Sequence, residues 1–228
     1  MLFRSFHLNT KVSAINDDKV LAEKDGKEIA VQAEKLLIAV GRKVNVENLG
    51  LEEIGVEFST KSVIIDKNCR TNIPNVYAAG DVTGFSLLAH TAYREAEVAV
   101  NHMLGKKDFM RYNAIPAVVY TNPEISCVGL TEEVAKKKQI AYKAHSLPMT
   151  FAGRFIAENE GFNGLCKILI GEKHKEILGV HMIGNPSSEM IYGAAMAIEM
   201  QMRVEDVKEI VFPHPTVSEI FREMVFEF

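Results

Sequence analysis

The stretch Thr71-Asn-Ile-Pro-Asn-Val-Tyr-Ala-Ala-Gly-Asp81 gives the strongest indication of fold class in this chain of 228 residues. Its apolar residues predict a strand over 75–79 that delivers Gly80 and Asp81 to its carboxyl end, where open α/β sheets bind ligands. Glycine lets the backbone approach a ligand closely, and the Asp81 carboxylate could accept a hydrogen bond from a sugar or ribityl hydroxyl. A plain strand-turn-helix unit, with Asp81 as a turn residue, is the favoured alternative for a lone Gly-Asp pair.

The residues on either side of this stretch continue an α/β pattern. Leu87-Leu-Ala-His90 opens a helix predicted to reach Leu104, and the free N–H groups at such a helix start favour electron-rich ligand atoms. Upstream, the apolar run over 35–40 ends in Gly41 and predicts a strand buried on both faces.

The remaining elements predict antiparallel strands near the N-terminus and an α+β layer in the second half. Strands are predicted over 11–15, 19–23 and 28–31, separated by an Asn-Asp-Asp turn at 16–18 and by Asp25-Gly26, a strong hairpin signal. From about residue 111 we expect strands over 117–120 and 124–129, a helix capped by Thr131, strands near 140–147, 155–158, 164–170 and 176–183, and helices over 188–200 and from 217 onward. Strands followed by helices with few parallel crossovers are typical of α+β architecture.

The helix expected near 188–202 carries four methionines (Met190, Met196, Met200 and Met202) among small residues. Methionine at such spacing commonly fills a core. A helix this rich in small residues could equally pack against a twin helix in a dimer. Periodicity alone does not separate a core face from an interface face, so both interpretations stay open.

The heptapeptide Pro213-His-Pro-Thr-Val-Ser-Glu219 is the second informative stretch. An imidazole followed by a carboxylate suggests a general base, because the carboxylate can fix the histidine tautomer. Two structural alternatives compete with catalysis. Thr216-x-x-Glu219 is also a helix capping box, and His214 between two prolines could sit in a rigid surface turn.

Composition argues for a soluble globular protein: 47% of residues are hydrophobic, 25% are charged and the net charge is −4. No basic stripe points to nucleic acid or a membrane surface, and no apolar run approaches the roughly 18 residues that a membrane span needs. The first seven residues do not form a signal peptide, so we expect a cytoplasmic protein. Cys69, Cys127 and Cys166 form no CxxC pair and no zinc spacing, which indicates isolated thiols and no metal site.

Four stretches in order carry a resemblance to a known family: 37–42, 71–81 with 87–90, 116–124 with 128–131, and 214–219. On these residues the chain resembles the C-terminal part of the FAD- and NAD-dependent pyridine nucleotide-disulfide oxidoreductases, and among them the dihydrolipoamide dehydrogenase family. Glutathione reductases share the framework. The Thr-Asn-Pro-Glu form at 121–124 and the single acid at Glu219, followed by Ile220, are more similar to the lipoamide enzymes.

The resemblance implies an α+β interface (dimerisation) domain with partial α/β FAD/NAD-binding segments. Residues 1–44 would be the remnant of an NAD-binding domain, 45–111 the second segment of the FAD-binding and central domain, and 112–228 the interface domain. No GxGxxG fingerprint and no Cys-x4-Cys occur in the chain. We therefore expect a C-terminal fragment that is inactive alone and that folds mainly over 112–228, as a dimer.

The resemblance also implies roles for individual residues. Asp81 would bind the FAD ribityl chain, and Leu88, Ala89 and His90 would present backbone N–H groups near the pyrimidine edge of the flavin. Gly80 and Leu87 would also belong to the cofactor-binding residues. Gly41 would line the NAD site. His214 would deprotonate the dihydrolipoyl thiol in the active site of the other subunit, oriented by Glu219.

The activity implied is oxidation of dihydrolipoamide to lipoamide by a homodimer, with electrons passing through a disulfide and FAD to NAD+. The implied partner is a lipoyl-bearing protein of a 2-oxoacid dehydrogenase or glycine cleavage complex. Two alternatives remain: another FAD-dependent reductase that acts on glutathione disulfide, and a non-catalytic dimerisation module.

Overall fold

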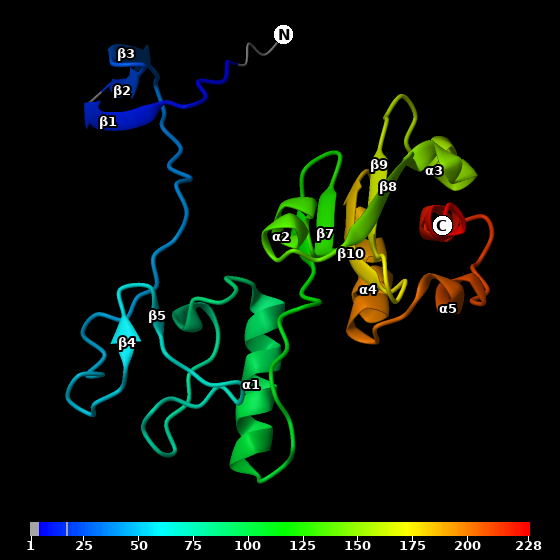
Figure 1. Cartoon of the computed structure of the whole chain (residues 1–228). Helices are drawn as coiled ribbons and strands as arrows, with labels where there is room; N and C mark the ends of the chain where they lie inside the picture. The colour runs from blue at the N-terminus through cyan, green and yellow to red at the C-terminus, as the bar shows by residue number, and fades with distance from the viewer. Residues whose placement is uncertain (1–4, 17) are drawn as a thin grey trace. The chain divides into compact units, whose positions relative to one another are not determined.

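The computed structural model describes residues 5–16 and 18–228. Residues 1–4, which begin the segment tested for a signal peptide, and residue 17, in the middle of the predicted Asn-Asp-Asp turn, lie outside the described residues. The chain divides into two compact units, Met1–Lys43 and Val44–Phe228. Each is described by itself (Figure 1).

The first unit contains a three-stranded antiparallel sheet, as predicted. Strands β1 (Lys11–Asn16), β2 (Lys19–Lys24) and β3 (Lys27–Gln32) lie in the order β1-β2-β3. Asp25 and Gly26 join β2 to β3 with φ angles of 51° and 72°. Two consecutive left-handed residues match the twist of the hairpin, which explains the Asp-Gly sequence.

The strand predicted over 35–40 is absent from this unit, so that prediction was wrong. The segment is irregular, and Leu37 and Val40 are 88% and 90% exposed. A strand buried on both faces needs parallel neighbours and covering helices. Among the described residues, no parallel strand pairs with this segment.

The first part of the second unit surrounds the predicted Gly-Asp turn. It holds the short hairpin β4 (Phe58–Ser59) and β5 (Ser62–Val63), the 3-10 turn η1 (Asp81–Thr83) and helix α1 (Ala89–Met103). The strand predicted over 75–79 is reduced to one isolated bridge between Arg70 and Tyr77. The cause is the same as for 35–40: the described chain offers no parallel strand beside it.

The rest of the second unit is an antiparallel sheet with helices, the α+β architecture expected. Its strands are β6 (Ala117–Val119), β7 (Ile125–Gly129), β8 (Tyr142–Pro148), β9 (Leu165–Gly171) and β10 (Ile177–Ile183). They lie in the order β6-β7-β10-β9-β8. The central strand, β10, therefore pairs with strands on both sides, which suits its apolar sequence.

Helices cover one face of this sheet and enclose its core. Helix α4 (Ser187–Glu199) packs on β7 and β10, and α6 (Glu219–Phe226) packs on β8 and β9. The short helix α2 (Glu132–Lys137) lies on the opposite face, where Thr131 caps it by accepting a hydrogen bond from the Val134 N–H. The largest fully buried side chains of the core are Val128, Met149, Phe155, Ile168, Ile170, Ile177, Val180, Ile220 and Met224.

Two details of this region differ from the sequence-based expectation. The strand predicted over 155–158 is instead helix α3 (Gly153–Glu158), which follows the 3-10 turn η2 (Met149–Phe151). An ion pair between Arg154 and Glu158, one helical turn apart, supports the helix, and Phe155 is anchored in the core. Helix α5 (Val204–Lys208), not predicted, buries Val204 and Val207.

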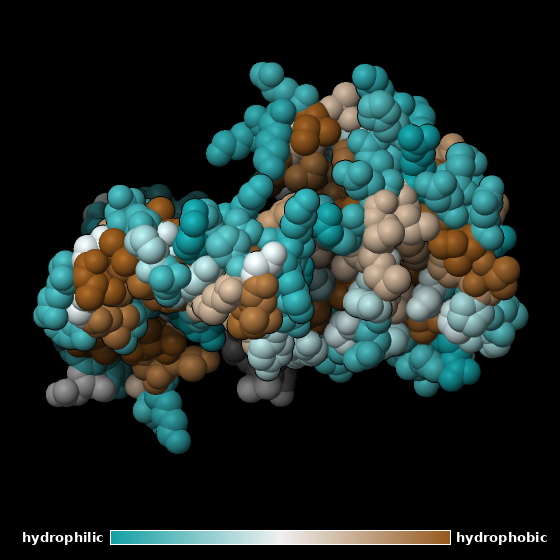
Figure 2. Space-filling view, turned by 90° about the horizontal axis from the view of Figure 1, so that it is seen from below, coloured by the Kyte–Doolittle hydropathy of each residue, from teal (hydrophilic) through white to brown (hydrophobic). Residues whose placement is uncertain are grey.

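The methionines of helix α4 and its C-terminal end lie on two different faces. Met190 packs against the core, as does Met202 just beyond the helix. Tyr192, Met196 and Met200 form an exposed stripe at four-residue spacing, with exposed fractions of 68%, 50% and 73%. Figure 2 shows hydrophobic residues at the surface on the face that it displays.

Among the described residues, no helix is long and apolar enough to cross a membrane.

Candidate functional site

The predicted histidine-carboxylate pair is formed. His214 Nδ1 lies 2.8 Å from Glu219 Oε1. The imidazole lies on the loop before α6 and is 80% exposed, whereas the Glu219 side chain is 18% exposed at the start of α6. Because an ionised carboxylate only accepts, Nδ1 carries the proton and Nε2 presents its lone pair. The arrangement can therefore accept a proton at Nε2.

Glu219 also makes half of the alternative capping box. Its other oxygen, Oε2, accepts a hydrogen bond of 2.8 Å from the Thr216 N–H. The Thr216 hydroxyl does not complete the box, because it donates instead to the Pro213 carbonyl oxygen at 2.9 Å. The Thr216 hydrogen bond, and then the bond to His214, hold the pKa of the Glu219 carboxyl below its usual value. The acid thus orients the imidazole and secures the helix start at once.

The Gly80–Asp81 turn is built from one buried and one exposed residue. Gly80 is buried with φ of 85°, a left-handed value that favours glycine. Asp81 is exposed at the first position of η1. The turn therefore offers a carboxylate at the surface of a fixed backbone bend.

The start of α1 lies beyond this turn. Leu88 is the N-cap, and the first helical hydrogen bond of α1 runs from the Thr91 N–H to the Leu88 carbonyl oxygen, so the N–H groups of Ala89 and His90 precede it. Leu87, Ala89 and His90 are exposed. The His90 imidazole has a role the sequence did not indicate, since Nε2 donates to the Pro116 carbonyl oxygen at 2.8 Å. It joins α1 to the chain entering β6.

Glu95 is the residue near the turn that sequence reasoning missed. Its carboxylate is fully buried and accepts a hydrogen bond of 2.6 Å from the Gly80 N–H. The signal was present in the sequence: Thr91, Glu95, Val98 and Ala99 share one helix face at positions i, i+4, i+7 and i+8. A carboxylate in an apolar stripe needs hydrogen-bond donors.

The remaining predicted site residue, Gly41, belongs to the other unit. It is exposed with φ of 96° and has open space where a side chain would be. Within the second unit, no hydrogen bond or ion pair between described residues joins the His214–Glu219 pair to the Gly80–Asp81 turn. The structure therefore presents the predicted residues as separate groups.

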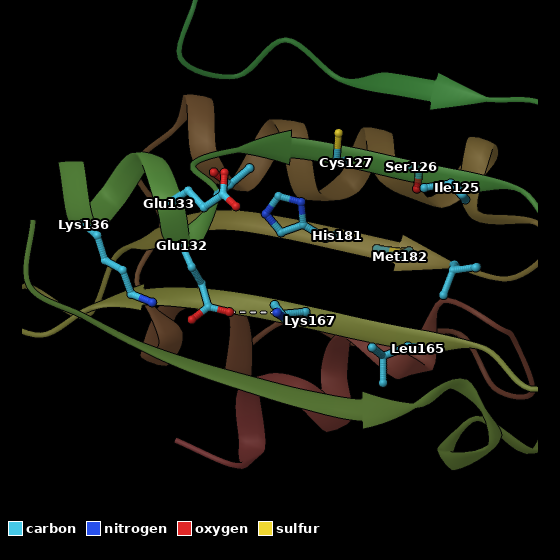
Figure 3. Close-up of a pocket in the computed structure, with 12 residues that line it drawn as sticks. Ile125, Ser126, Cys127, Glu132, Glu133, Lys136, Leu165, Lys167, His181 and Met182 are labelled. Atoms are coloured by element: carbon cyan, nitrogen blue, oxygen red, sulfur yellow. Dashed lines mark hydrogen bonds and ion pairs between the residues drawn. The ribbon is translucent and has the colours of Figure 1, made fainter. Parts of the chain in front are cut away.

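A groove of about 710 Å³ lies elsewhere, on the sheet face that α2 partly covers (Figure 3). Several of the polar side chains that line it already have hydrogen-bond partners. Lys167 Nζ bonds Glu132 at 2.7 Å, and His181 Nε2 donates to the Leu130 carbonyl oxygen at 3.0 Å. The groove contains neither the histidine-carboxylate pair nor the Gly80–Asp81 turn.

The cysteines of the chain are free. Burial raises the pKa of the Cys69 and Cys166 thiols to about 12, so both stay protonated at neutral pH. Within the described part of the chain, no group of three or more His, Cys, Asp or Glu residues is placed to hold a metal ion.

Comparison with known families accounts for most of the chain. Residues 115–225 match the family described as "Pyridine nucleotide-disulphide oxidoreductase, dimerisation domain". Residues 5–102 match the family described as "Pyridine nucleotide-disulphide oxidoreductase".

Individual relatives agree. The chain is 37% identical over 226 residues to the mitochondrial dihydrolipoyl dehydrogenase of Bos taurus, covering 96% of this chain and 44% of that protein. It is 38% identical over 219 residues to the dihydrolipoyl dehydrogenase of Buchnera aphidicola, covering 93% and 46%. The chain thus spans about half the length of the curated relatives it matches.

Solved structures share the fold. The crystal structure of LpdA from Mycobacterium tuberculosis matches with a TM-score of 0.85 at 26% identity, covering 96% of this chain and 48% of that one. RclA from Escherichia coli, an HOCl-induced flavoprotein disulfide reductase, matches with a TM-score of 0.78 at 26% identity, covering 92% and 48%.

Proposed function

The chain belongs to the pyridine nucleotide-disulphide oxidoreductase family, and from this premise we propose that it forms part of a flavoprotein that oxidises dihydrolipoamide to lipoamide with NAD+ as acceptor. The observation that carries the proposal is the 2.8 Å contact between His214 and Glu219. The identity of 37% to a dihydrolipoyl dehydrogenase supports the choice of substrate.

His214 acts as the base in this proposal. A thiol gives up its proton to the free Nε2, and the resulting imidazolium is stabilised by the Glu219 carboxylate at Nδ1. The Thr216 N–H holds the second carboxylate oxygen, so the pair keeps its orientation while the proton moves. An imidazole that is 80% exposed needs a further surface to exclude water, which a second subunit would supply.

The cofactor residues fit a flavin nucleotide by the chemistry of their donors and acceptors. The exposed Asp81 carboxylate accepts hydrogen bonds from hydroxyls such as those of a ribityl chain, and Ala89 and His90 offer N–H groups at a helix start. Bound FAD would supply the redox chemistry, and NAD+, whose site would include Gly41, would accept the electrons. Members of the family use FAD and NAD(P).

We further propose that the protein is a homodimer in which the α4 stripe meets its copy. The match over residues 115–225 to a dimerisation domain supports this, as do the exposed Tyr192, Met196 and Met200. Analytical ultracentrifugation should give twice the chain mass of 25.4 kDa. M196K should return the mass to one chain, whereas M103K, at an exposed methionine of α1, should leave the dimer intact. If M196K and M103K had the same mass by ultracentrifugation, the assignment of the α4 stripe as the dimer interface would be contradicted.

The substrate is tested in a full-length hybrid. The chain is joined behind the remaining half of the Bos taurus relative, and only hybrid that carries yellow flavin is assayed. We expect NADH formation from dihydrolipoamide and none from the 228-residue chain alone. Preferential oxidation of NADPH by glutathione disulfide would favour the reductase alternative. No flavin binding and no turnover by a folded dimer would favour a non-catalytic module.

The physiological thiol donor proposed is a lipoyl-bearing protein of a 2-oxoacid dehydrogenase or glycine cleavage complex.

A further inference from the structure

Glu95 is a buried carboxylate, and among the residues that the structure describes no cation forms an ion pair with it. Its side chain, on α1, is 0% exposed, beside the buried Cys69 and Val98. The adjacent cation, Arg94, is committed elsewhere, because its guanidinium makes two hydrogen bonds to Asp108, of 2.9 and 2.5 Å. Removing a carboxylate from water is costly, so its retention here requires compensating donors.

Three donors converge on this carboxylate. The Gly80 N–H donates to Oε2 at 2.6 Å, and the Tyr112 hydroxyl donates to Oε1 at 2.7 Å. The Thr83 hydroxyl lies 3.3 Å from Oε1 and 2.9 Å from the Gly80 carbonyl oxygen, so it shares its proton between them. Burial raises the pKa of Tyr112, and the hydrogen bond to Glu95 raises it further.

These donors come from two segments, the η1 turn and the stretch that contains Tyr112, and both must be aligned with α1 for the turn to form. Gly80 and Thr83 bracket Asp81, and Tyr112 lies 17 residues beyond Glu95 in the segment leading to the sheet. Tyr112 also stacks on Phe85 with ring centroids 4.8 Å apart, which secures the loop between η1 and α1. The carboxylate therefore fixes the peptide group between Ala79 and Gly80, one residue ahead of Asp81.

We propose that Glu95 is the positioning residue of the cofactor turn: through the Gly80 N–H it sets the backbone from which Asp81 presents its carboxylate to a ribityl hydroxyl. The inference rests on the proposed function, in which Asp81 contacts FAD. Glu95 itself touches no cofactor.

The first experiment needs no flavin. In the ¹⁵N-labelled 228-residue chain, the Gly80 amide proton should resonate far downfield, as expected for a short bond to a charged acceptor. The Glu95→Gln substitution should move the Gly80 amide resonance upfield, but the proton should remain protected from exchange with solvent. An amide oxygen still accepts from Gly80, and the amide nitrogen can donate to the Tyr112 oxygen.

A matched variant separates positioning from packing. Glu95→Leu fills the same space without an acceptor, and Gly80 exchange should become roughly ten- to a hundredfold faster. Tyr112→Phe should leave Gly80 protected. The proposal is overturned if Gly80 is not downfield in the native chain, or if Gln and Leu at 95 give the same Gly80 exchange. If the Glu95→Leu variant does not fold, the chemical shift of the Gly80 amide proton in the native chain and in Glu95→Gln still tests the proposal.

A second measurement separates this inference from the proposed function. FAD affinity is measured by flavin fluorescence for the full-length hybrid and its Asp81→Asn, Glu95→Gln and Glu95→Leu variants. We expect the Asp81→Asn and Glu95→Leu variants to bind FAD roughly tenfold more weakly than the native hybrid. The Glu95→Gln variant should bind FAD with an affinity close to native. If FAD affinity falls in Asp81→Asn but not in Glu95→Leu, the role of Glu95 is refuted and the flavin contact of Asp81 stands. If FAD affinity does not fall in Asp81→Asn, the flavin contact of Asp81 is refuted, and the NMR signal of the Gly80 amide still tests whether Glu95 holds the turn.

Discussion

The antiparallel sheet of the second unit and the 35–40 segment of the first contain similar apolar residues, but the structure treats them in opposite ways. In β9, Ile168 and Ile170 are at most 1% exposed beneath the helices, whereas Leu37 and Val40 are 88% and 90% exposed. Strand β9 is paired on both sides, whereas no strand in the described part of the chain pairs with 35–40. Apolar sequence alone does not make a strand; pairing partners do.

The availability of a pairing partner also depends on how far away it lies in the sequence. Hairpins such as β2–β3 form because the partner follows within a few residues and Asp25-Gly26 sets the register. Parallel strands require neighbours from distant parts of a chain. The two regions thus make opposite predictions for similar substitutions.

The largest effect is expected from emptying the core of the sheet region. Phe155→Ala should lower the free energy of unfolding of the second unit by about 3–5 kcal/mol, because Phe155 is fully buried. Leu37→Ala should change stability by less than about 0.5 kcal/mol. Urea denaturation followed by circular dichroism measures both. A comparable loss for Leu37→Ala would show that 35–40 is packed in solution.

A smaller effect is expected at two left-handed glycines. Gly26 has φ of 72° and open space beside it, so Gly26→Ala should cost about 1–2 kcal/mol from backbone strain alone. Gly129 has φ of 79°, and an added Cβ would clash with the Leu178 carbonyl oxygen and the Ile198 side chain. Gly129→Ala should therefore cost more. Hydrogen exchange resolves each unit separately, and equal losses would contradict the tighter packing assigned to the sheet region.

The smallest effect concerns Glu219 at the surface of the sheet region. Its pKa lies below the ordinary 4.5, chiefly because of the Thr216 N–H. A depressed carboxyl pKa stabilises the fold fully above pH 4.5, and the contribution is lost as pH falls through the folded-state value. The Thr216 amide shift in NMR should therefore titrate with a midpoint below 4.5 and be flat in Glu219→Gln. A midpoint at or above 4.5 would contradict the contact.

Sequence reasoning succeeded where chemistry is local. The hairpin at Asp25-Gly26, the Thr131 cap and the His214–Glu219 contact each depend on residues close in sequence, and all three are formed. It failed over 35–40 and 75–79, where strand formation depends on neighbours that the pattern cannot supply. It also read 155–158 as a strand, because a short apolar run does not reveal that one side chain, Phe155, will anchor a helix turn.

The Gly80–Asp81 turn shows a different limit. Gly80 and Asp81 were recognisable, but the role of Glu95 depends on a hydrogen bond to a backbone group 15 residues away. A lone acid in an apolar helix stripe was the visible sign, and only the fold identifies its donors.

The most direct test of the central claim is the rate of NAD+ reduction by dihydrolipoamide in the flavin-loaded hybrid, compared with its His214→Gln variant. Loss of a general base predicts a fall in kcat of roughly 10²–10⁴-fold with flavin content unchanged. His145→Gln, at a histidine of β8 beside Glu227, serves as the matched control and should retain native turnover. A His214→Gln rate within twofold of the native hybrid would contradict the assignment of this imidazole as the base.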